Sequence, residues 1–105
     1  MGLTKTELFT EEQNKIAAIA KVIGHPARVA ILQHLLKANS CICGEIVEVI
    51  GLSQPTISQH LKELKTIGLI IGNISGTSIC YCINPKMYRH TKTLFNQMFD
   101  QELPE

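Results

Sequence analysis

The feature that most constrains the fold of this sequence is a tight turn, Gly51-Leu52-Ser53, between two segments with helical character. The upstream segment is short and mostly apolar. In the downstream segment Ile57, Leu61 and Leu64 recur at helical spacing, so one face is apolar and the opposite face is polar. A short helix, a glycine-containing turn and an amphipathic second helix are typical of a helix–turn–helix, which we predict over residues 44–66.

Two extended segments, residues 69–74 and 78–83, follow the second helix directly. They are rich in isoleucine and are separated by Ser75-Gly76-Thr77, and a short gap that contains glycine predicts a β-hairpin. A hairpin that comes directly after a helix–turn–helix is the order of a winged helix. We therefore predict that residues 69–83 form the wing.

Further helices are predicted on both sides of this unit. Thr10-Glu11-Glu12-Gln13 has the pattern of a capping box, and Gly24 ends the helix that it begins. Pro26 suits the first turn of the next helix, and Asn84-Pro85 begins the last one. The second helix is expected to bury Val29, Leu32, Leu35 and Leu36. The predicted fold class is mostly α with a small β-hairpin, a winged helix–turn–helix in the order ααααββα.

The length of 105 residues fits a single domain, predicted to span residues 1–105. A net charge of +1 excludes a broadly basic surface but is compatible with a local basic patch. The first ten residues lack the apolar core of a signal peptide, and no apolar stretch could span a bilayer. We therefore expect a cytoplasmic protein with no membrane partner, whose four cysteines are thiols rather than structural disulfides.

The polar face of the second helix is suited to DNA. On a helical wheel Gln59, Thr56 and Lys62 lie away from the apolar face, where such side chains can read base edges or bind phosphates. A solvated helix of a bundle would show the same face, but the hairpin that follows favours DNA binding. The predicted DNA-binding residues are Ser53, Gln54, Thr56, Ser58, Gln59, His60 and Lys62, with Ser75 and Thr77 in the wing. At the edge of the apolar face, His60 suits packing or a phosphate contact rather than catalysis.

Several motifs resemble those of the ArsR/SmtB family, which are winged-helix repressors that respond to metals or other small signals. The motifs are His25-Pro26-Ala27-Arg28-Val29-Ala30-Ile31-Leu32, Cys41-Ile42-Cys43-Gly44-Glu45-Ile46, Gly51-Leu52-Ser53-Gln54-Pro55-Thr56-Ile57-Ser58-Gln59-His60-Leu61-Lys62, Gly68-Leu69-Ile70 and Ile83-Asn84-Pro85. The resemblance implies a homodimer built on helices 10–23 and 85–102. It also implies a double-stranded DNA operator with an inverted repeat, released when an effector binds. The wing departs from the family pattern, because residues 73–78 carry no positive charge.

The same resemblance places Cys41 and Cys43 where family members with a thiolate site carry a Cys-x-Cys motif. On a regular helix these two side chains would point about 200° apart, whereas on an extended segment they would face one side. Cys80 and Cys82 have the same spacing on the second wing strand. In winged helices the segment before the third helix can pair with this strand, which would bring all four cysteines together.

Three interpretations of the four cysteines stay open. They are reduced side chains without a role, ligands for a soft metal or metalloid ion (arsenite, cadmium, lead or copper(I)), or a redox or sulfur sensor. No cofactor is required in any of them. The family's other metal site, a carboxylate/His site on the last helix, is rejected because Tyr88, Gln101 and Pro104 occupy its positions.

Together these patterns predict a sequence-specific DNA-binding transcriptional regulator that is not an enzyme. We expect a homodimeric repressor that a thiol-directed effector, either a soft metal or metalloid ion or an oxidant, releases from its operator. One alternative is a winged helix used as a protein-docking module, which the uncharged wing supports. Another is a small thiol redox protein that uses Cys41 and Cys43. The lack of a thioredoxin-like βαβ pattern and of an acid/base constellation argues against the second.

Overall fold

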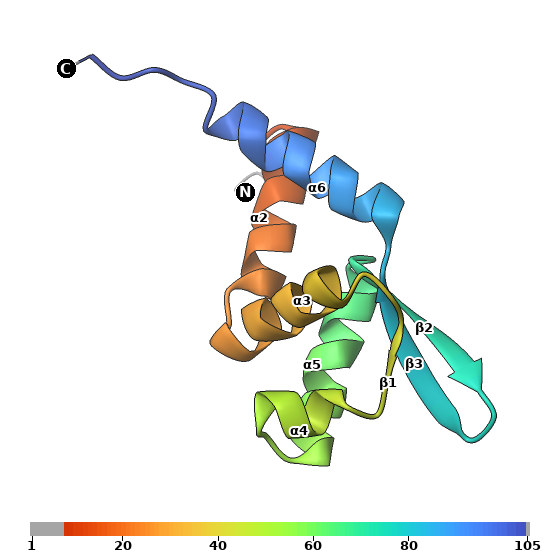
Figure 1. The fold of residues 1–105 in the computed structure, drawn as a ribbon. Helices are drawn as coiled ribbons and strands as arrows, with labels where there is room; N and C mark the ends of the chain where they lie inside the picture. The colour runs from red at the N-terminus through yellow and green to blue at the C-terminus, as the bar shows by residue number, and fades with distance from the viewer. Residues whose placement is uncertain (1–7, 105) are drawn as a thin grey trace.

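The computed structural model describes residues 8–104, so residues 1–7 and 105 of the predicted domain lie outside the described part (Figure 1). The elements run in the order α2 (Glu11–Ile23), α3 (Pro26–Ala38), β1 (Ile42–Cys43), α4 (Ile46–Ile50), α5 (Gln54–Thr66), β2 (Ile70–Ser75), β3 (Ser78–Ile83) and α6 (Pro85–Met98). The predicted winged-helix order is confirmed, and the segment before the third helix forms the short strand β1. Figure 1 shows the β2–β3 hairpin projecting away from the helices.

Local sequence signals fix the ends of the first helices. The capping box of α2 forms as predicted, since the Gln13 amide N–H donates to Thr10 Oγ1 and the Thr10 amide N–H donates to Gln13 Oε1, both at 3.0 Å. The cap of α3 is His25, whose Nδ1 accepts a hydrogen bond of 3.1 Å from the Ala27 amide N–H. At its other end α3 stops at Asn39, which has a φ of 53° in the left-handed region.

The three strands form one antiparallel sheet in the order β1-β3-β2. In the first pairing Ile42 lies opposite Tyr81 and Cys43 lies opposite Cys80. The hairpin pairing runs from Ile70 opposite Ile83 to Ser75 opposite Ser78, so Gly76-Thr77 alone connects the strands, one residue fewer than predicted. Because alternate strand residues face opposite sides, Cys80 and Cys82 lie on one face of β3, and Tyr81 and Ile83, which pack against the core, lie on the other.

The core is aliphatic, as the composition predicts. Its most deeply buried side chains are Ile19, Ile31, Leu35, Ile57, Leu64 and Ile70. The predicted buried stripe of α3 is wrong at Val29 and Leu36, which are 42% and 41% exposed. The buried face of α3 instead carries Ala27, Ile31 and Leu35. The helix is oriented in this way because it packs against four elements, α2, α4, α5 and β3. Four-residue spacing keeps these three side chains on one narrow face.

Two helix boundaries differ from the predicted ones. The third helix was expected from residue 44, but Gly44 has a φ of 78° and α4 begins at Ile46. The last helix was expected to reach residue 102, whereas α6 ends at Met98. Asp100 and Glu102 lie within the next four residues, and negative charges oppose the dipole at the C-terminal end of a helix.

Within residues 8–104 no single helix is long and apolar enough to cross a membrane. Helices α2 and α3 pass that test of length and composition only as a pair, which is bent by 94°.

Two adjacent leucines test the observed orientation of α3. Leu35→Ala removes a side chain that is 1% exposed and is expected to lower the free energy of unfolding by about 2–5 kcal/mol. Leu36→Ala, at a position that is 41% exposed, is expected to cost less than about 1 kcal/mol. Urea unfolding followed by circular dichroism measures both variants, and equal losses would contradict this orientation.

Candidate nucleic-acid interface and cysteine cluster

A tight turn sets the angle between α4 and α5. Gly51 has a φ of 83°, and its amide N–H donates to the Val47 carbonyl oxygen at 2.9 Å. A Cβ at Gly51 would meet nothing within 4 Å, so the left-handed backbone rather than a lack of space requires glycine here. The chain then becomes extended at Ser53, and α5 begins at Gln54.

Helix α5 has one buried and one exposed face, as its sequence predicts. Ile57, Leu61 and Leu64 are buried against the core. The rest of the helix surface carries five of the predicted DNA-binding side chains, all of which are exposed: Gln54, Thr56, Ser58, Gln59 and Lys62. Thr56, Gln59 and Lys62 point away from the buried face, whereas Gln54 and Ser58 lie beside it, next to Ile57 and Leu61.

Neighbouring side chains on this surface hold one another in place. The hydroxyls of Ser53 and Thr56 are hydrogen-bonded at 2.9 Å, and Gln54 Nε2 donates to Ser58 Oγ at 3.2 Å. Ser53 occupies the N-cap position, but its side chain makes no capping hydrogen bond. The first-turn amide N–H groups of α5 are therefore left without a side-chain acceptor, as an anion-binding helix N-terminus requires.

His60 lies apart from the exposed surface and is only 8% exposed. Arg28 Nε donates to His60 Nδ1 at 3.0 Å, and Arg28 Nη1 donates to the Val22 carbonyl oxygen at 3.0 Å. The His25 ring lies against the His60 ring, with a centroid distance of 4.5 Å. Of the two roles predicted for His60, this arrangement matches packing, because the imidazole ties α5 to α3 and to the end of α2.

The surroundings of His60 favour its neutral form. Burial of the imidazole, and to a lesser extent the nearby His25 and Arg28, hold the pKa of His60 below its ordinary value of 6.5. In this form Nδ1 accepts the hydrogen bond from Arg28, and Nε2 carries the proton.

The wing contributes a small, uncharged tip. Ser75 and Thr77, predicted to bind DNA, are both exposed there. Ile74 and Ile79 lie opposite each other at the end of the hairpin and are 84% and 51% exposed. The structure does not bring Ser75 or Thr77 into a hydrogen bond with α5 within the described residues.

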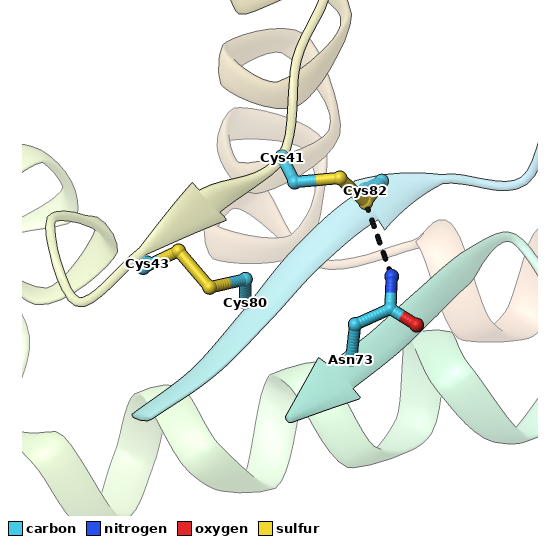
Figure 2. The surroundings of a disulfide bond; sticks show 5 residues. All are labelled: Cys41, Cys43, Asn73, Cys80 and Cys82. Carbon is cyan, nitrogen blue, oxygen red and sulfur yellow. Dashed lines mark hydrogen bonds between the residues drawn. A yellow bond between two sulfur atoms is a disulfide. The ribbon is translucent and has the colours of Figure 1, made fainter. Parts of the chain in front are cut away.

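The sequence left open whether the four cysteines meet, and the structure brings them together. Strand β1 pairs with β3, and Figure 2 shows the four side chains along these two strands. Cys41 is bonded to Cys82 and Cys43 to Cys80, with Cα–Cα distances of 4.4 and 4.1 Å. The expectation of free thiols is therefore wrong for this structure. The physical reason is the register of the strands. Residues directly opposite each other in an antiparallel pair have Cβ atoms close enough for their two sulfur atoms to bond.

One residue beside the cysteines was missed by the sequence reasoning. Asn73 Nδ2 donates a hydrogen bond of 3.7 Å to Cys82 Sγ (Figure 2). Asn73 lies on β2, and only the register of β2 on β3 places it next to the cysteines. A polar residue among the isoleucines of the strand is the signal that the sequence offered.

In this form the cysteines do not constitute a metal site. Among residues 8–104 no group of three or more His, Cys, Asp or Glu side chains is placed to hold a metal ion. Each sulfur is bonded to another sulfur, whereas a soft metal or metalloid binds the thiolate. The four residues therefore fit such an ion only after both disulfides are reduced.

The fold and the exposed face of α5 define a winged helix–turn–helix protein. Residues 25–71 match the model of the arsR family of bacterial regulatory proteins. An uncharacterized HTH-type transcriptional regulator of Methanocaldococcus jannaschii is 39% identical over 74 residues, which cover 70% of this chain and 82% of that protein. The chain therefore belongs to the arsR family.

Other relatives share part of the chain or its fold. The HTH-type transcriptional repressor SmtB of Mycobacterium tuberculosis is 35% identical over 63 residues, or 60% of this chain. Those residues are 46% of SmtB, so the chain spans about half the length of that relative. Among solved structures, HlyU from Vibrio cholerae superposes with a TM-score of 0.71 at 23% identity, covering 89% of this chain and 100% of HlyU. This likeness supports the same fold.

Acidification is expected to destabilise the fold through His60. Because its pKa is lower in the folded chain than the ordinary 6.5, the unfolded chain binds more protons between these values. The contribution of His60 to the free energy of unfolding is therefore complete above pH 6.5. It is lost as the pH falls from 6.5 through the pKa that His60 has in the folded chain. Urea unfolding at about pH 7.5 and about pH 5 measures the difference.

The variants His60→Gln and His90→Gln separate this effect from general acid sensitivity. His60→Gln is expected to lose less stability between the two pH values than the parent chain. His90, exposed on α6, is the matched control, and its variant should behave as the parent does. An unchanged pH dependence in His60→Gln would contradict the assignment.

Proposed function

We propose that this chain is a sequence-specific DNA-binding transcriptional repressor that acts as a homodimer on an inverted-repeat, double-stranded operator. A thiol-directed effector, either an oxidant or a soft metal or metalloid ion, releases it from the DNA. The observation that carries the proposal is the exposed polar face of α5 on a helix–turn–helix with the left-handed glycine at its turn. The role is one of binding, and no residue is assigned to catalysis.

The side chains of α5 suit recognition in the major groove. Glutamine can bond to both N6 and N7 of adenine, and serine or threonine can bond to several bases. Lys62 and the first-turn N–H groups of α5 suit phosphates, which position the helix. We assign these contacts to Ser53, Gln54, Thr56, Ser58, Gln59 and Lys62, with Ser75 and Thr77 of the wing beside them. His60 positions α5 through Arg28.

Exposed apolar side chains support the homodimer. Helices α2 and α6 contact each other, and large apolar residues stand exposed just before α2, at the end of α6 and beyond it. They are Leu8, Phe9, Met98, Phe99 and Leu103, of which Phe99 is 75% exposed. Apolar side chains gathered in this way mark a protein interface. A second copy of the chain is the partner we propose for it.

The cysteines support control by thiol chemistry. Cys43 lies three residues before α4, and its partner Cys80 lies in the wing. Oxidation therefore links the entry to the helix–turn–helix with the wing by covalent bonds. A soft metal or metalloid would compete for the same sulfurs in their reduced form. We therefore expect the position of α4 relative to the wing to differ between the oxidised protein and the reduced protein bound to such an ion.

A gel shift with the DNA upstream of the chain's own gene tests DNA binding. Reduced protein is expected to shift this DNA, and oxidation with diamide is expected to weaken the shift. Gln59→Ala should cost about 1–3 kcal/mol in specific binding, because a base contact is lost. Gln33→Ala, an exposed glutamine on α3, is the matched control and should bind as the parent does. No shift at low salt, with or without reductant, would contradict the repressor and favour the docking module.

The homodimer has a separate test. Phe99→Asp places a charge in the proposed interface and is expected to convert the dimer to a monomer in sedimentation velocity. Ile74→Asp makes the same change at the wing tip, where the side chain is 84% exposed, and should leave the dimer intact. A parent chain that sediments as a monomer at micromolar concentration would overturn this part of the proposal.

A further inference from the structure

The two disulfides differ in their surroundings, because the Cys41–Cys82 bond borders a cavity that could hold a ligand. A cavity of about 350 Å³ lies between the end of α3, the end of β3 and the start of α6. Cys41 and Cys82 both line it, whereas Cys43 and Cys80 do not. Cys80 is moreover only 5% exposed. A small molecule in this cavity would therefore touch the Cys41–Cys82 bond and not the other.

The walls of the cavity indicate the chemistry of that molecule. Apolar side chains such as Leu35, Leu36 and Ile83 form much of the lining. Arg89 is the one charged residue among the lining residues, and its side chain makes no hydrogen bond or ion pair within residues 8–104. Arg89 is itself solvent-exposed, and an exposed guanidinium on the wall of a largely apolar cavity favours a short aliphatic ligand with a carboxylate.

The sulfur atoms of this bond differ in how well they leave. Asn73 Nδ2 donates its 3.7 Å hydrogen bond to Cys82 Sγ, and within the described residues no other cysteine sulfur accepts a side-chain hydrogen bond (Figure 2). A hydrogen-bond donor beside a sulfur stabilises the thiolate that forms there, and a more stable thiolate is the better leaving group in exchange. Cys41 is the exposed partner and Cys82 the half-buried one. Attack at Cys41 with departure of Cys82 is thus the favoured direction.

We propose that this cavity binds a low-molecular-weight thiol that carries a carboxylate, and that the bound thiolate opens Cys41–Cys82 in preference to Cys43–Cys80. The thiol loses its proton to solvent, and its sulfur attacks Cys41 Sγ. The Cys41–Cys82 bond breaks, its electron pair stays on Cys82 Sγ as a thiolate, and a mixed disulfide remains on Cys41. One sulfur–sulfur bond forms as one breaks, so no further oxidant or reductant is consumed.

This inference deepens the proposed thiol control by naming the reactive pair, but its chemistry is measured without DNA. The probes are 3-mercaptopropionate and 3-mercaptopropanol, which match in length and differ in charge. The double variant Cys43→Ser/Cys80→Ser retains only the proposed reactive disulfide, and Cys41→Ser/Cys82→Ser retains only the other. Each oxidised protein is mixed with thiol, the freed thiolate is trapped with iodoacetamide, and intact and fragment masses are recorded.

The first variant is expected to react at least about tenfold faster with 3-mercaptopropionate than the second, since its bond borders the cavity. The thiol adduct should lie on Cys41 and the alkyl group on Cys82. Equal rates in the two variants, or an adduct mainly on Cys82, would overturn the proposal. Circular dichroism of both variants, before thiol is added, confirms that each is folded.

Two side chains test the cavity itself in the Cys43→Ser/Cys80→Ser background. Arg89→Gln is expected to lower the rate at which 3-mercaptopropionate opens the disulfide about fivefold. The rate with 3-mercaptopropanol should stay unchanged, because only 3-mercaptopropionate carries a carboxylate. Asn73→Ala should slow both thiols by about threefold or more, because the leaving thiolate loses its donor. If Arg89→Gln affects both thiols equally, the cavity does not select a carboxylate. An unchanged rate in Asn73→Ala would contradict the leaving-group assignment.

Discussion

Burial of the apolar face of α5 is the interaction on which the rest of the structure depends. Ile57 and Leu64 are 1% and 0% exposed, so the helix has one rotational setting, and that setting turns Gln59 and its polar neighbours to solvent. The Arg28–His60 hydrogen bond adds a polar tie to the same face. Because packing fixes the rotation, the polar surface is organised before any DNA is present, and little ordering cost remains to be met on binding.

The sequence allowed the helices, the turn and the wing to be predicted because their signals are local. The capping box at Thr10 and Gln13 and the glycine at Gly51 need only their own neighbours to take effect. The predictions failed where long-range packing decides, as at Val29 and Leu36, whose exposure depends on which elements lie across α3. The polar face of α5 could be derived from periodicity, whereas the place of His60 needed the position of Arg28.

The cysteines show the same division. Their spacing correctly predicted that they would lie on one face of paired strands, but not that each would stand directly opposite a partner. Register decides this, since a shift by one residue would place them against Tyr81 and Ile83 instead. The role of Asn73 depends on the same register through β2.

The nesting of the two disulfides has a consequence for the integrity of the molecule. The bonded cysteines are 41 and 37 residues apart in sequence, so each bond closes nearly the same ring of the chain. The whole of α4, α5 and β2 lies within that ring. Closing a ring of this size removes about 4 kcal/mol of chain entropy from the unfolded state, and a second bond two residues away removes little more. Opening the outer bond therefore leaves the inner one to keep the ring closed. In the proposed exchange, the helix–turn–helix would therefore stay within a covalently closed ring while the outer bond is open.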